Sequence, residues 1–197
     1  GIMEKLFNVT VKAVKLSLCF LLFVQMVFSQ TRYGVPISRL KRLRRGYNVK
    51  TAAYNRSDIS ESTITGLKNK GYTFARIGIH PSDVYSSSNP GSPKSTGVNR
   101  LKKAAALCKK HDMACLLEIH KTNSRPIYDY VTDKYITFMG ALARELSSTD
   151  PEYTFLEIIN EPTPPSRDAD DWWPHMEKIA KAMREGAPHH TIALNGS

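Results

Sequence analysis

Cysteine is scarce in this sequence, with three residues in 197. Cys19 lies in an apolar N-terminal segment, so the rest of the chain keeps only Cys108 and Cys115, too few for the disulfide framework of a small secreted domain. A single bridge between these two stays open. The sequence also lacks an HExxH motif and closely spaced cysteine pairs, and it therefore predicts no metal site.

Long apolar runs are absent except for one near the N-terminus. The run Leu16–Phe28 has about thirteen residues, whereas a helix that crosses a bilayer needs about twenty. Three lysines precede it and a cleavage pattern at Val27-Phe28-Ser29 ends it, which is typical of a signal peptide. We therefore expect a signal peptide over residues 1–29, export to the extracellular or periplasmic space, and no stable membrane anchor after cleavage.

Acidic residues are outnumbered, 18 against 28 basic ones, which gives a formal charge of +10. Much of the surplus lies in the run Arg39–Arg45, which could be a phosphate-binding patch, a dibasic processing site or a solvated approach to a strand. We favour the last interpretation. No nucleic-acid partner is expected, because the run is short, has no interleaved aromatic residue beyond Tyr47, and belongs to an exported chain.

Tight β-hairpin signals are missing as well, and short apolar runs instead alternate with amphipathic stretches. This alternation is typical of βα units that build a parallel sheet. The strands we expect are Gly46–Val49, Thr73–Ile79, Met113–Ile119, Tyr153–Ile159 and Thr191–Leu194. No second domain is indicated, so residues 30–197 form one domain, and the Ser/Pro/Gly-rich stretch 81–97 is interpreted as a long loop after a strand.

The helices between these strands each carry one apolar stripe. Ser57 or Asp58 is expected to cap the first of them. Of the adjacent Trp172 and Trp173 in the last, one is expected to pack on the sheet and the other to lie at the rim, with Trp173 favoured for the core.

The segment Phe155–Pro162 (FLEIINEP) is the most informative one for chemistry. It is an apolar strand that delivers an amide, Asn160, and a carboxylate, Glu161, at its C-terminal end, where barrel enzymes place catalytic residues. A carboxylic acid there can donate a proton to a leaving oxygen and later activate water. Asn160 can hold a substrate hydroxyl beside it.

The motif Asn160-Glu161-Pro162 resembles the acid/base motif of glycoside hydrolase family 5, the cellulase family. Other segments follow in the family's order: Arg45-Gly46-Tyr47-Asn48-Val49, Phe74-Ala75-Arg76-Ile77-Gly78-Ile79, Leu117-Glu118-Ile119-His120 and Ala187–Leu194 are similar to strands one, two, three and five. The resemblance covers nearly all of the chain beyond residue 29.

This resemblance implies an α/β fold, a (β/α)8 TIM barrel truncated to about its first four to five βα units. It also implies that Glu161 is the general acid/base, that Asn160 binds the sugar 2-hydroxyl, and that Arg76 and His120 line the subsite at the scissile bond. The implied partner is a β-1,4-linked polysaccharide or oligosaccharide, cleaved with retention by an endoglucanase-type enzyme. No metal or organic cofactor is implied.

The family's catalytic nucleophile, on strand seven, has no counterpart in these 197 residues. A retaining mechanism needs two carboxyl groups about 5 Å apart, and this sequence supplies one of them. We therefore expect the chain to be incomplete and inactive alone. Two alternatives stay open: a β-mannanase, and a non-catalytic or degenerate carbohydrate-binding fragment.

Two further glutamates and a second histidine compete for roles. Glu157 is a rival for the acid role, but Glu157 and Glu118 lie within strands, where a buried carboxylate needs a partner such as Arg76. We therefore expect both to support the site. His80 is a weaker candidate than His120 for contact with substrate.

Overall fold

The computed structural model of the chain describes residues 34–120, 133–161 and 169–194. The predicted signal peptide (1–29) and Pro162 lie outside these ranges. The chain divides into two units, residues 1–40 and 41–197. The described part of the first holds the start of a short helix, α2 (Ile37–Arg42), and the second carries the whole sheet. Within the described ranges, no helix has the length and apolar character needed to cross a membrane.

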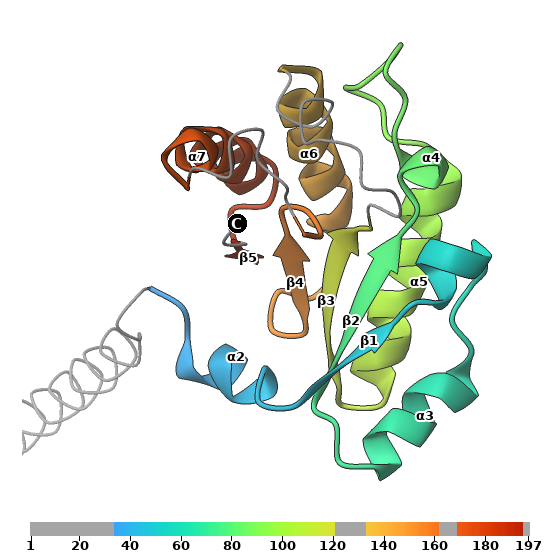
Figure 1. Ribbon diagram of the computed structural model, residues 1–197. Helices are drawn as coiled ribbons and strands as arrows, with labels where there is room; N and C mark the ends of the chain where they lie inside the picture. Colours follow the sequence, from blue (N-terminus) through green and yellow to red (C-terminus); the bar gives the residue numbers. More distant parts are fainter. Residues whose placement is uncertain (1–33, 121–132, 162–168, 195–197) are drawn as a thin grey trace, which may run out of the picture. The chain divides into compact units, whose positions relative to one another are not determined.

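One parallel sheet organises the second unit, with its strands in sequence order. The strands are β1 (Gly46–Val49), β2 (Phe74–Ile79), β3 (Ala114–Ile119), β4 (Thr154–Glu157) and β5 (Thr191–Ala193). Parallel pairing and all five strand positions are confirmed, although β4 ends two residues earlier than expected. Figure 1 shows the strands side by side, with β1 at one edge and β5 at the other.

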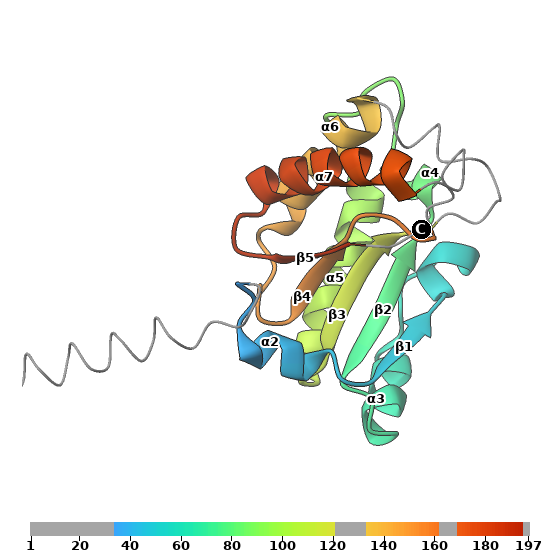
Figure 2. The same ribbon diagram turned by 60° about the vertical axis from the view of Figure 1, so that its left-hand side comes forward.

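Four long helices connect the strands and cover the sheet: α3 (Glu61–Asn69), α5 (Ser95–Lys110), α6 (Asp133–Leu146) and α7 (Ala169–Gly186). Helix α5 lies along β2 and β3, and α6 packs against α7 (Figures 1 and 2). Two short elements follow the first two strands, a π-helical turn η1 (Thr51–Asn55) and helix α4 (Pro81–Val84). The stretch 81–97 is therefore a loop that contains α4 and the start of α5.

The two faces of the sheet differ in chemistry. On β2, Ala75, Ile77 and Ile79 are fully buried in the apolar core with the helices. Because side chains alternate along a strand, Arg76 and Gly78 point to the opposite face. The same alternation on β3 places Glu118 on that opposite face, so charged residues gather where the helices do not lie.

Three details correct or complete the sequence analysis. The first long helix is capped by Ser60, whose hydroxyl accepts a hydrogen bond from the Thr63 amide at 3.2 Å, so a cap at Ser57 or Asp58 was wrong. Trp172 is buried and Trp173 is 52% exposed, the reverse of the favoured assignment. Cys108 and Cys115 are buried free thiols, so the bridge that the sequence left open is not formed.

Candidate active site

Arg76 within β2, His120 directly after β3 and Asn160 beyond β4 belong to one polar cluster: Arg76 donates to Asn160 Oδ1, and Glu118 lies beside both Arg76 and His120. Parallel pairing puts the carboxyl ends of the three strands at the same edge of the sheet. The backbone N–H of Asn160 donates to the Ile119 carbonyl oxygen at 3.1 Å, which holds the segment after β4 beside the end of β3. Asn160 itself is buried, and Glu161 comes next and is exposed.

Arg76 is the centre of the polar cluster on this face. Its Nε donates to Glu157 Oε2 at 2.7 Å, and one terminal nitrogen donates to Glu157 Oε1 at 2.5 Å and to Asn160 Oδ1 at 3.0 Å. Glu118 Oε1 lies 3.7 Å from the other terminal nitrogen. The planar guanidinium thus binds one carboxylate with two parallel hydrogen bonds and neutralises a second.

The charge of Arg76 is secured by these acids. Burial works to lower the pKa of Arg76, but the hydrogen bonds to Glu157 and the charges of Glu118, Glu157 and Glu161 outweigh it and raise the pKa above its ordinary value. Both oxygens of Glu157 accept from this cation. This arrangement suits Glu157 as a support for Arg76 rather than as the proton donor.

His120 is held at both ring nitrogens. Its Nδ1 lies 2.6 Å from Glu118 Oε1, and its Nε2 lies 3.2 Å from the Tyr54 hydroxyl. Glu118 is 3% exposed, and burial raises its pKa, against the opposing effects of His120 and Arg76. Among the described residues, its second oxygen has no hydrogen-bond partner.

Gly78 makes room for this pair. A Cβ atom at Gly78 would lie 2.3 Å from Glu118 Oε1 and 2.8 Å from His120 Cβ, distances that real Cβ contacts do not show. A side chain at position 78 would therefore displace the Glu118 carboxylate, and glycine is required by close approach rather than by a turn.

Glu161 differs from the two buried glutamates in both exposure and backbone. It is exposed to solvent, and its φ of 41° lies in the left-handed region, which is uncommon for a residue other than glycine. Such conformations concentrate at functional sites, where the surrounding structure holds them. The described site therefore offers one solvent-facing carboxylate next to Arg76 and two internal ones.

Tyr54, on η1, is the site residue that the sequence analysis missed. Its ring lies 5.2 Å from the His120 ring, centroid to centroid, and is 54% exposed. The segment has no apolar periodicity, so only its proximity to β1 could have drawn attention to it. His80 instead caps α4, with Nδ1 at 2.6 Å from the Ser82 hydroxyl, and does not join the cluster.

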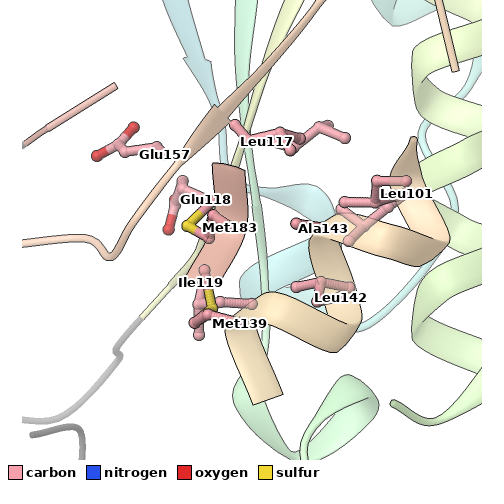
Figure 3. A pocket seen from close by; sticks show the side chains of 11 residues that line it. Leu101, Leu117, Glu118, Ile119, Met139, Leu142, Ala143, Glu157 and Met183 are labelled. Atoms are coloured by element: carbon pink, nitrogen blue, oxygen red, sulfur yellow. The ribbon is translucent and has the colours of Figure 1, made fainter. Parts of the chain in front are cut away.

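A small cavity behind the site is not a substrate cleft. It lies between the sheet and the helices and has a volume of about 10 Å³, close to the space of one water molecule. Figure 3 shows its apolar lining, with Glu118 and Glu157 at one end. Within the described residues, no group of histidine, cysteine or acidic side chains is arranged to hold a metal ion.

Comparison with protein families places this geometry in context. The model of the family Cellulase (glycosyl hydrolase family 5) matches residues 36–197. The chain belongs to this family. The match includes every site residue described above and confirms the resemblance found in the sequence. No curated protein sequence matches the chain.

Solved structures support the barrel-type fold of this family 5 chain. Thermotoga maritima Cel5A in complex with cellobiose is 21% identical, with a TM-score of 0.69 over 82% of this chain and 54% of that one. The same enzyme with mannotriose is 20% identical, with a TM-score of 0.68 over 82% and 54%. The Prevotella bryantii endo-β-mannanase/endo-β-glucanase PbGH26A-GH5A is 12% identical, with a TM-score of 0.65 over 80% and 28%. The chain spans about half the length of the Cel5A structures.

Proposed function

We propose that this chain provides the acid/base side of a retaining glycoside hydrolase that cleaves β-1,4-linked polysaccharides, of the endoglucanase type. The observation that carries the proposal is the exposed Glu161, in the segment that follows β4, next to Asn160 of the cluster around Arg76. Membership of family 5 supports it.

In this proposal Glu161 protonates the oxygen of the leaving sugar and then removes a proton from the attacking water. Asn160 Oδ1 already accepts a hydrogen bond from Arg76. Its amide nitrogen is therefore the group that is turned to a substrate hydroxyl, and it donates to the sugar 2-hydroxyl. Arg76 and His120 line the subsite at the scissile bond, and Glu157 and Glu118 hold them there.

Among the described residues, neither buried glutamate of the cluster is suited to act as the nucleophile, and we propose that the nucleophile is supplied from outside this chain. A retaining enzyme needs a second carboxylate about 5 Å from the acid, free to attack the anomeric carbon. Glu157 is engaged by Arg76 with both oxygens, and Glu118 is 3% exposed beside His120. Neither is suited to attack, so we expect the chain to bind glycan without turning it over alone.

Two glycans are candidate substrates. The Cel5A structures hold cellobiose and mannotriose, and the Prevotella protein is both an endo-β-mannanase and an endo-β-glucanase by name. Cellulose-type glucan is our first choice and β-mannan the alternative. Non-catalytic glycan binding is a second candidate function, favoured because Glu157 is paired with Arg76 and Glu118 with His120.

We further propose that the chain is exported after removal of residues 1–29. Finding the chain outside the cell with Gln30 as its first residue tests this proposal.

The deciding experiment measures glycan binding and glycan cleavage on the same preparations. We expect the chain to be retarded in gels containing carboxymethyl-cellulose or glucomannan, and to release no reducing ends from either. Asn160→Ala should weaken the retardation, whereas Glu145→Gln, an exposed acid on α6 paired with Lys102, should not. Reducing ends that disappear with Glu161→Gln would place a nucleophile within this chain. Absence of retardation by any β-1,4-glycan would refute the proposed function.

A further inference from the structure

The ion-paired Asp83, on α4, lies outside the cluster around Arg76. Its side chain is 7% exposed, yet it binds two cations from different parts of the chain. Arg56, just after η1, donates to Asp83 Oδ1 from Nε at 2.9 Å and from a terminal nitrogen, and Arg100 on α5 donates to Oδ2 at 2.7 Å. Buried acids of this kind need their partners, so the position of Arg56 is strongly constrained.

Arg56 also has an unusual backbone. Its φ of 54° and ψ of 35° are left-handed, a conformation that residues other than glycine rarely adopt and that persists where the surroundings impose it. Residues 54–58 are all exposed, so burial of this segment does not fix its path. The two hydrogen bonds to Asp83 tie this exposed turn to α4, between the buried Ala53 of η1 and the buried Ile59.

Tyr54 lies two residues before Arg56 and reaches the candidate active site. Its hydroxyl is 3.2 Å from His120 Nε2, while His120 Nδ1 is 2.6 Å from Glu118 Oε1. In the neutral ring beside an ionised Glu118, the carboxylate accepts, so Nδ1 carries the proton toward Glu118 and Nε2 accepts from the Tyr54 hydroxyl. The contact with Tyr54 therefore completes the selection of one tautomer and one ring orientation.

We propose that Asp83 is a positioning residue of the candidate active site: through Arg56 it holds the turn after η1, so that Tyr54 fixes the tautomer and orientation of His120. An effect of Asp83 on glycan affinity rests on the proposed function, in which a fixed His120 ring presents a defined edge to the sugar. The contacts themselves are independent of any substrate.

The test uses nitrogen-15 NMR of the His120 ring in the full chain. Tyr54→Phe removes the hydroxyl and should shift the Nε2 signal. Arg56→Asn and Asp83→Asn should produce a shift in the same direction, although neither residue touches His120. Asn tolerates the left-handed backbone, and Arg100 still pairs with Asp83 in Arg56→Asn, so this variant removes one of the two ion pairs and leaves the buried acid with a cation. Glu61→Gln is the matched control, because the exposed Glu61 pairs with Lys110 and His111, which are not partners of Asp83.

A wild-type Nε2 signal in folded Arg56→Asn would overturn the proposal, as would an equal shift in Glu61→Gln. Re-formation of the wild-type signal in Arg56→Lys, which restores a cation for Asp83, would support it. Glycan affinity is measured in parallel and should fall about tenfold in Arg56→Asn, the scale typical of residues that orient a site residue. If wild-type protein binds no glycan, the proposed function fails while the NMR result still decides the role of Asp83.

Discussion

At the scale of single residues, the site depends on one cation that serves two buried acids. Arg76 contacts Glu157 at 2.5 Å and Glu118 at 3.7 Å, and both acids are under 5% exposed. Taking two carboxylates out of water is costly, and the attraction of Arg76 offsets that cost only while the pairing is intact. Burial of the two carboxylates therefore requires the ion pairs with Arg76, although these pairs add little net stability.

We predict that Arg76→Met lowers the free energy of unfolding by about 3–5 kcal/mol, the scale for removing one partner of a buried ion pair. Lys103→Met, which removes an exposed partner of Asp58, should cost less than about 1 kcal/mol. Urea denaturation at neutral pH measures both. The Arg76→Met loss should shrink as the pH falls, because protonated Glu118, whose pKa burial raises, no longer needs a cation. Equal losses for the two variants would contradict this account.

At the scale of elements, periodicity carried most of the information that the sequence held. The five strands were predictable because each is a short apolar run between amphipathic stretches. The expected association of Arg76 with Glu118 and Glu157 followed from the need of a carboxylate within a buried strand for a cationic partner. Asn160 and Glu161 were predicted as site residues because they end the apolar run of the FLEIINEP segment and because that segment resembles the family's acid/base motif.

The errors at this scale have physical reasons. The buried stripe of α7 is Trp172, Met176, Ile179 and Met183. Trp172 lies four residues and Trp173 three residues before Met176, and both spacings occur along one face of a helix, so spacing alone does not choose between the two tryptophans. The Ser60 cap was missed because the stretch Ser57–Ser62 offers several hydroxyls and acids with similar capping ability. Tyr54 and Asp83 lie in short elements whose shape depends on long-range ion pairs, which no local pattern reveals.

The close packing of helix α6 on helix α7 gives a prediction at the scale of elements. A Cβ atom at Gly186 would lie 2.3 Å from the Gly140 carbonyl oxygen and 2.9 Å from the Arg144 amide, both backbone atoms that cannot turn aside. Gly186→Ala should therefore lower the free energy of unfolding by about 1–3 kcal/mol through overpacking. Gly66, within α3, has nothing within 4 Å of the same added atom.

Gly66→Ala is thus the matched control, and it should raise the free energy of unfolding by about 0.5–1 kcal/mol through helix propensity alone. Thermal and urea unfolding of the two variants give the comparison. Stabilisation by both substitutions would mean that α6 and α7 lie further apart than described.

At the scale of the whole molecule, the sheet has two edges within the described residues, the outer sides of β1 and β5. A closed barrel has no such edges, and the chain spans about half the length of the barrel enzymes it matches. An open strand edge presents unpaired backbone donors and acceptors that attract another strand. Tyr47, on β1, adds a half-exposed aromatic ring at one edge.

We therefore predict that the purified chain is marginally stable and associates, with an apparent mass that rises with protein concentration in light scattering. Tyr47→Lys should weaken this association, because a lysine on an edge strand opposes pairing with a further strand. Trp173→Lys replaces an equally exposed aromatic residue on α7 and should leave the association unchanged, since it lies on a helix rather than a strand edge. A monomer that unfolds sharply, reversibly and independently of concentration would show that the edges are satisfied within the chain itself.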